Sequence, residues 1–123
     1  MTTCDVAPYD VFLMWVEFPD HPGIGKTRPV VITEVDDDSI SGVVAKVTSR
    51  TDWTGAGDVL LLDWQEAGLL APSMVRCGER FEFKREDLYR RFGALSDRDA
   101  ERVASGLERT QDVLPHKRVR PRD

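Results

Sequence analysis

The sequence predicts a mainly β (α+β) fold, in which five or six short strands form a small barrel beside one C-terminal amphipathic helix. Short apolar or alternating runs, separated by turn-forming residues, fill the first two-thirds of the chain. A helical repeat of apolar residues follows them. Because 123 residues make one ordinary core, we expect a single domain over residues 1–115. A basic, disordered tail is expected over residues 116–123.

The predicted strands follow one another closely along the chain. Residues 11–18 form a nearly unbroken apolar run with three aromatic side chains, which is typical of a strand buried on both faces. Further strands are predicted over residues 30–35, 40–49, 59–63 and 73–83, with a short one over 88–92.

One helix is predicted from Ser96 onward. Ser96-Asp97-Arg98-Asp99 resembles a capping box in which Asp99 replaces the usual glutamate. Apolar side chains then recur at helical spacing, at Ala100, Val103, Ala104, Leu107 and Leu114. Gly106 weakens this helix by about 1 kcal/mol relative to alanine, a cost that packing can offset.

Composition excludes several classes of protein. No stretch approaches the ~20 apolar residues that cross a bilayer, and the N-terminus lacks a signal-peptide pattern. Cys4 and Cys77 make no disulfide framework, and the two histidines add no zinc-ligand spacing. We therefore expect a cytoplasmic protein without a cofactor, a metal or a membrane partner. The net charge of −5 argues against a generic nucleic-acid coat, but a locally basic site on an acidic body remains open.

The most distinctive segment is His-Pro-Gly-Ile-Gly-Lys-Thr-Arg-Pro-Val-Val-Ile-Thr, residues 21–33. Its Gly-Lys-Thr matches the end of a nucleotide-binding P-loop, but that motif needs a glycine where Asp20 stands and a helix directly afterwards. Pro29 disfavours helical geometry at Arg28, and the β-branched residues after it favour a strand. The segment is therefore predicted to be a cationic loop that connects two strands and faces an anionic ligand.

Strand alternation gathers cationic and hydroxyl side chains on shared faces. In the strand 40–49, the face opposite the valines carries Lys46, Thr48 and Arg50. In the strand 73–83, Arg76, Gly78 and Arg80 fall opposite the apolar side. Such faces are commonly the solvated outside of a barrel, so a functional cluster is one of two interpretations.

Several motifs in series resemble the PemK/MazF family of toxin endoribonucleases. They are Val11-Phe-Leu-Met-Trp-Val16, Gly25-Lys-Thr-Arg-Pro-Val-Val-Ile32, Val47-Thr-Ser49, Ser73-Met-Val-Arg-Cys77 and Gly93-Ala-Leu-Ser96 before the helix. The resemblance covers roughly residues 9–110. It implies an SH3-like barrel of the CcdB/PemK type, usually a homodimer. It also implies metal-independent, sequence-specific cleavage of single-stranded RNA, with inhibition by a cognate antitoxin.

In that family the ribose 2′-hydroxyl attacks the adjacent phosphate, which leaves a 2′,3′-cyclic phosphate and a 5′-hydroxyl end. This chemistry needs positioning, proton transfer and stabilisation of negative charge, for which arginine is well suited. The resemblance places Arg28 and Arg76 at the phosphate, with Thr48 as a hydroxyl donor. His21, with a one-residue offset, supplies an imidazole for proton transfer. Further RNA contacts are expected from Lys26, Thr27, Lys46, Ser49, Arg50, Trp53 and Arg80.

One position departs from the family pattern. Members with Val-Arg-Cys often carry next an aspartate thought to act as the base, and Gly78 stands there. Glu79 is adjacent, but alternation points it to the other face unless a bulge intervenes. The base is therefore open between His21, Glu17 and Glu79. A non-catalytic RNA- or protein-binding barrel is an alternative function. A gyrase-poisoning relative is another, although residues 121–123 lack the aromatic end that this activity requires.

Overall fold

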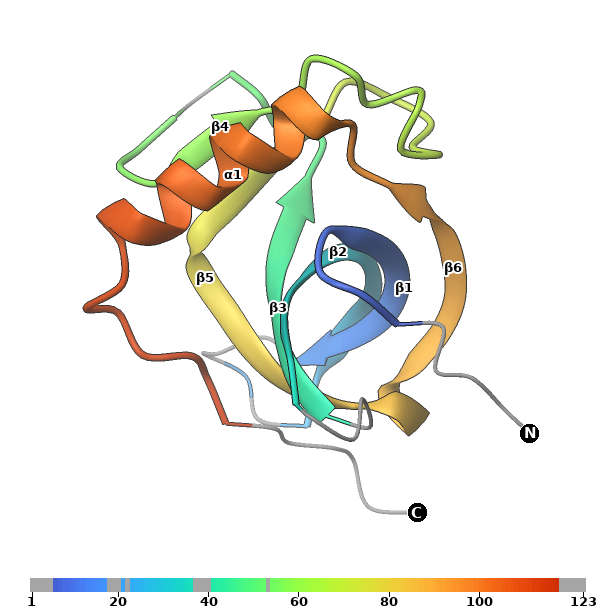
Figure 1. Ribbon diagram of the computed structural model, residues 1–123. Coiled ribbons are helices and arrows are strands. Elements are labelled where there is room, and N and C mark those ends of the chain that lie inside the picture. Colours follow the sequence, from blue (N-terminus) through green and yellow to red (C-terminus); the bar gives the residue numbers. More distant parts are fainter. Residues whose placement is uncertain (1–5, 18–20, 22, 37–40, 53, 118–123) are drawn as a thin grey trace.

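The computed structural model describes residues 6–17, 21, 23–36, 41–52 and 54–117. In this part of the chain one antiparallel sheet bends around the core, and α1 lies across β4 and β5 (Figure 1). The strand order is β4-β5-β3-β2-β1-β6. The described elements are β1 (Asp10–Glu17), β2 (Gly25–Val35), β3 (Ser41–Thr48), β4 (Asp58–Leu60), β5 (Met74–Lys84), the 3-10 turn η1 (Arg85–Asp87), β6 (Leu88–Ala94) and α1 (Asp97–Arg109).

These elements confirm the predicted mainly β fold with a C-terminal helix. The register pairs neighbouring strands in the printed order, and no pairing between the outer strands β4 and β6 closes the sheet among the described residues. The sheet is therefore strongly bent, and the term barrel applies to it loosely. None of the described helices is both long and apolar enough to cross a bilayer.

The segment predicted as a cationic loop is largely strand. β2 begins at Gly25, which pairs with Glu17, so the hairpin with β1 extends through Arg28 opposite Met14. The first β2 residue paired with β3 is Val30, opposite Lys46. Pro29 thus sits where β2 has no partner on that side, which is a position that tolerates the missing N–H of proline.

Apolar side chains pack in two clusters. One contains Phe12, Met14, Val30, Ile32, Val44, Phe81 and Phe83. The other contains Val11, Val31, Ala45, Val47, Val59, Val75, Cys77 and Val103 of α1. Since successive residues of β2 and β3 alternate between the two clusters, the sheet is buried on both faces along these strands.

The helix begins as predicted but ends earlier. Ser96 is the N-cap, and its Oγ accepts from the Asp99 backbone N–H at 3.3 Å. Asp99 does not complete the capping box; its buried carboxylate accepts from the backbone N–H groups of Leu62 at 3.0 Å and Asp63 at 2.7 Å. The prediction that Leu114 belongs to the helix is wrong, because α1 ends at Arg109 and the Leu114 side chain is exposed.

β5 carries a bulge that the alternation pattern did not reveal. Ala45 pairs with Arg80, and the next residue, Lys46, pairs with Arg76, so residues 77–79 of β5 have no partners on β3. The bulge places Arg80 on the same face as Ala45. The predicted RNA contact of Arg80 is therefore wrong: its side chain is buried and donates through Nη2 to the carbonyl oxygens of Thr110, at 2.8 Å, and Val113.

The segment after α1 returns to β5. His116 forms a parallel bridge with Phe81, donates its N–H to the Arg80 carbonyl at 2.8 Å and accepts from the Glu82 N–H at 2.9 Å. Its ring stacks on Phe81 with centroids 4.9 Å apart. The packed chain thus extends past the predicted boundary at residue 115, whereas residues 118–123 of the predicted tail lie outside the described residues.

Candidate functional site

Three strands bring cationic and hydroxyl side chains to one face of the sheet. Lys46 on β3 pairs with Val30 of β2 on one side and with Arg76 of β5 on the other. Arg28 and Thr48 lie two residues along β2 and β3, so alternation returns them to the same face as Lys46. Alternation predicted a shared face for Lys46 and Thr48 on β3, and the β3–β5 register adds Arg76 to that face.

These side chains line a cavity of about 370 Å³, which we call the cationic cavity. Its lining residues are Arg28, Lys46, Thr48, Arg50, Asp52 and Arg76. Four of the six side chains are cationic, which makes the cavity suited to a phosphate group.

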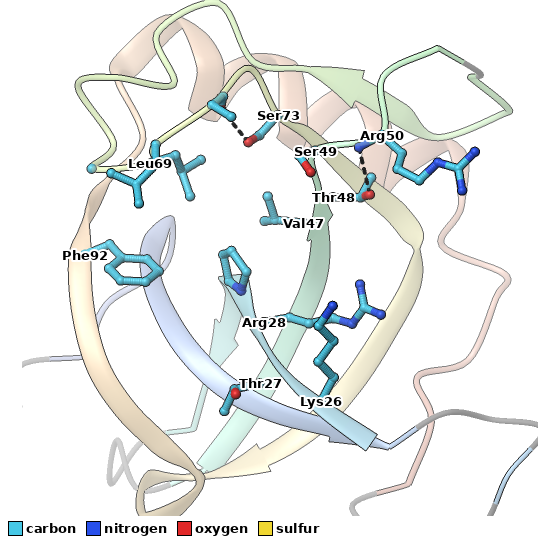
Figure 2. Close-up of a pocket in the computed structure, with 14 residues that line it drawn as sticks. Lys26, Thr27, Arg28, Val47, Thr48, Ser49, Arg50, Leu69, Ser73 and Phe92 are labelled. Atoms are coloured by element: carbon cyan, nitrogen blue, oxygen red, sulfur yellow. Dashed lines mark hydrogen bonds between the residues drawn. The ribbon is translucent and has the colours of Figure 1, made fainter. Parts of the chain in front are cut away.

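A second cavity of about 510 Å³, which we call the groove, adjoins it. The two share Arg28, Thr48 and Arg50. Figure 2 shows Lys26, Arg28 and Arg50 at one end of the groove and Leu69 and Phe92 at the other. Thr27, Pro29, Val47, Ser49, Gly68, Leu70, Ala71 and Ser73 complete the lining. The groove therefore joins a cationic end to an apolar end.

Arg76 is held by a carboxylate that sequence reasoning missed. Its Nη1 donates to Asp58 Oδ2 at 2.9 Å, and both side chains are largely buried. The same Asp58 oxygen accepts from the Gly55 backbone N–H at 2.7 Å. Asp58 lies opposite Arg76 in the β4–β5 register, and only that register identifies the pair. The carboxylate fixes the position of the guanidinium at the edge of the cationic cavity.

Thr48 is positioned by the backbone that follows β3. Its Oγ1 accepts from the Arg50 backbone N–H at 3.1 Å, and the residue is buried and lines both cavities. A hydroxyl that accepts in this way keeps its O–H to donate. Thr48 can therefore donate to an oxygen of a bound anion.

Glu79 lies beside the same face because of the β5 bulge. Its Oε1 is 3.5 Å from Lys46 Nζ. The position of Glu79 on this face depended on a bulge, and β5 contains one. The bulge places the Glu79 carboxylate next to Lys46, which lines the cationic cavity.

The other predicted site residues are not all brought together. Among the described residues, Lys26, Thr27, Ser49 and Arg50 line the groove. His21 is exposed in the β1–β2 connection, where its carbonyl accepts from the Ile24 N–H at 3.0 Å, and it lines neither cavity. Trp53 lies outside the described residues. No cluster of three or more potential metal-ligating side chains occurs in the described part of the chain.

The fold and the site define a class: a small, bent antiparallel sheet with a C-terminal helix and a cavity lined by cationic side chains on three of its strands. The family described as PemK-like, MazF-like toxin of type II toxin-antitoxin system matches residues 7–110. The chain belongs to this family.

Solved structures share the fold. An endoribonuclease in complex with its cognate antitoxin, from a mycobacterial species, superposes with a TM-score of 0.65 at 13% identity, over 87% of this chain and 95% of that chain. The Mycobacterium tuberculosis toxin MazF-mt6 gives 0.59 at 23% identity, over 84% and 98%. MazF from Deinococcus radiodurans gives 0.58 at 17% identity, over 84% and 94%. A comparison with curated proteins found no significant match.

Proposed function

We propose that this toxin is a sequence-specific endoribonuclease that cleaves single-stranded RNA without a metal and is inhibited by a cognate antitoxin. The observation that carries the proposal is the convergence of Arg28, Thr48 and Arg76 on one cationic cavity. Family membership and the fold shared with an endoribonuclease support it.

The reaction uses a nucleophile that the RNA itself carries. The ribose 2′-oxygen attacks the adjacent phosphorus, the bond from phosphorus to the 5′-oxygen breaks, and the products are a 2′,3′-cyclic phosphate and a 5′-hydroxyl end. Negative charge grows on the phosphoryl oxygens as the new bond forms. Arg28 and Arg76 stabilise that charge, and Thr48 donates a hydrogen bond to a phosphoryl oxygen.

The groove extends the site beyond the phosphate. Arg28, Thr48 and Arg50 belong to both cavities, so a strand whose reacting phosphate lies in the cationic cavity places a neighbouring nucleotide in the groove. The apolar end, with Leu69 and Phe92, offers a surface for an unpaired base. This geometry favours a single strand over a duplex, because a paired base cannot enter the groove.

The partners follow from the same proposal. The antitoxin is a segment that covers the groove and excludes RNA from it. The toxin acts in the cytoplasm as a homodimer. A mycobacterial endoribonuclease that shares the fold is itself in complex with its cognate antitoxin.

The test is cleavage of a long single-stranded RNA by purified protein in EDTA. We expect 5′-hydroxyl ends at short, recurring sequences, and we expect Arg28→Ala to abolish cleavage because the phosphorane loses a charge-assisted donor. Arg109→Ala, on the exposed surface of α1, is the matched control and retains cleavage.

A second function keeps a specific observation in its favour. Gly78 stands where the family resemblance implies an aspartate, so a non-catalytic RNA- or protein-binding role is the alternative. Intact RNA at high protein excess, with binding retained, would establish that alternative and refute the nuclease.

A further inference from the structure

We propose that Glu79 is the general base that removes the 2′-hydroxyl proton, a role that rests on the proposed nuclease function. The chain lacks the aspartate expected at position 78, so cleavage requires another proton acceptor near the cationic cavity. The bulge in β5 brings the Glu79 carboxylate beside Lys46 of that cavity.

The bulge over residues 77–79 determines where the Glu79 carboxylate lies. In a regular strand, residue 79 shares a face with Cys77, which is buried against α1. Because Lys46 pairs with Arg76 while Ala45 pairs with Arg80, the intervening residues leave the regular register. The Glu79 carboxylate consequently reaches Lys46, at 3.5 Å.

Lys46 connects Glu79 to the reacting phosphate. Its side chain is only 23% exposed and lines the cationic cavity with Arg28, Thr48 and Arg76. Glu79 is 44% exposed, so its carboxylate is open to solvent beside Lys46, which lines the cavity. A carboxylate in this position accepts a proton from the substrate and releases it to water.

Position 78, where the aspartate is missing, has different neighbours from position 79. A Cβ built on Gly78 has only Thr110 Cγ2 within 4 Å, at 3.8 Å. Position 78 therefore borders the end of α1, whereas position 79 borders Lys46. In this chain the bulge places the carboxylate of the following residue, Glu79, beside Lys46.

Two other carboxylates near the cavity fit the role less well. Asp58 is bound to Arg76 at 2.9 Å and to the Gly55 N–H, and its side chain is 6% exposed. Asp52 lines the cavity, but it lies in a loop, is 74% exposed and has its recorded ion pair with Arg50 at 4.0 Å. Glu79 is the one of the three that a strand positions and that remains accessible.

The proton balance of the step is complete. Glu79 takes the proton of the 2′-hydroxyl as the bond from that oxygen to phosphorus forms. The phosphorane then expels the 5′-oxygen, which receives a proton from water. Glu79 returns its proton to solvent, so the enzyme is unchanged and no oxidant or metal is consumed.

The experiment compares wild type, Glu79→Gln, Glu79→Asp and Asp52→Asn on one RNA oligonucleotide. Binding is measured separately with the same oligonucleotide carrying a 2′-deoxyribose at the cleavage site. We expect Glu79→Gln to lose at least about 100-fold in cleavage rate, as for removal of a general base, with binding changed less than about threefold. Glu79→Asp retains part of the activity, and Glu101→Gln on exposed α1 surface is the matched control.

A chemical rescue separates a base from a structural ion pair. Formate added to Glu79→Ala restores part of the cleavage rate if the missing group is a proton acceptor, and leaves it unchanged if Glu79 only holds Lys46. The melting temperature of each variant shows that it is folded. Rescue by formate supports the proposal, and its absence in a folded, RNA-binding variant overturns it.

The outcomes also separate this inference from the nuclease itself. If wild type cleaves and Glu79→Gln cleaves equally well, the base assignment is wrong and the nuclease stands. Loss of cleavage in Asp52→Asn but not in Glu79→Gln transfers the role to Asp52. If wild type leaves the oligonucleotide intact, the proposed function fails, and the role of Glu79 fails with it.

Discussion

Single residues decide how closely the elements of this protein approach one another. Gly106 lies on the buried side of α1, where a Cβ would stand 2.7 Å from Cys77 Sγ and 2.9 Å from Val59 Cγ2. Gly106 lowers the helix propensity of α1, as the sequence predicted, but the absence of its side chain allows α1 to pack closely on β4 and β5. Burial also raises the pKa of the Cys77 thiol to about 11, so the thiol remains protonated and unreactive at neutral pH.

Substituting Gly106 tests this contact. Alanine improves helix propensity by about 1 kcal/mol, but overpacking of a tight interface costs about 1–3 kcal/mol. We expect Gly106→Ala to lower the free energy of unfolding in urea, and Ser105→Ala, on the exposed side of α1, to leave it unchanged or higher. A more stable Gly106→Ala variant would show that the interface relaxes at no cost.

At the scale of elements, regular patterns predicted regular structure and failed where a strand is irregular. Alternation correctly placed Lys46 and Thr48 on one face of β3, and the β3–β5 register brings Arg76 to the same cavity. It misplaced Arg80, because a three-residue bulge in β5 moves every later residue of the strand to the opposite face. Simple alternation assumes a regular strand and cannot predict such a shift. Gly78 marks the bulge, but a glycine in a strand is equally compatible with a regular edge.

A second element-scale feature links the start of α1 to the connection between β4 and β5. Arg98 donates to both carboxylate oxygens of Asp63 at 2.7 Å, and Ser96 Oγ donates to Oδ2 at 2.6 Å. The hydrogen bonds from Arg98, followed by that from Ser96, hold the pKa of Asp63 well below its usual range. The α1 N-terminus is thereby tied to residue 63 as well as capped by its own serine.

This pair predicts a pH dependence of stability. A carboxyl whose pKa is lower in the folded state stabilises the fold above its unfolded pKa, about 3.9, and loses that contribution as pH falls toward the folded value. We expect Arg98→Ala to be less stable than wild type at pH 7, and the difference to shrink below about pH 4. Urea unfolding at several pH values measures it; a difference that does not shrink between pH 4 and pH 2 would point to packing instead.

For the whole molecule, the charge is divided between an acidic body and a cationic cavity. The net charge is −5, yet four cationic side chains line one small cavity. The family resemblance singled out Arg28, Thr48 and Arg76, and all three line this cavity, while their roles at a phosphate stay predictions. The sequence motifs gave no sign of Asp58, whose partner Arg76 is set by strand register, and they left Glu79 as one of three candidate bases, because its position depends on a bulge. The structure does not bring His21 to either cavity.

The division of charge predicts how RNA binding responds to salt. Each phosphate neutralised on a single strand contributes about −0.7 to the slope of log K against log salt concentration. Arg50 is exposed and borders both cavities, so we expect Arg50→Ala to weaken binding to the 2′-deoxy oligonucleotide and to reduce the slope by about 0.7. An unchanged slope would mean that Arg50 does not contact phosphate.

The return of the chain to β5 after α1 has a consequence for solubility. β4 pairs only with residues 74–76 of β5, and the Cys77 N–H bonds to the Gly57 carbonyl, so that side of β5 would present unsatisfied N–H and C=O groups beyond Cys77. His116 pairs there with Phe81. The Arg80 guanidinium fixes the segment that leads to His116 by donating to the carbonyl oxygens of Thr110 and Val113. The last described residues thus cover a sheet edge that would otherwise pair with strands of other molecules.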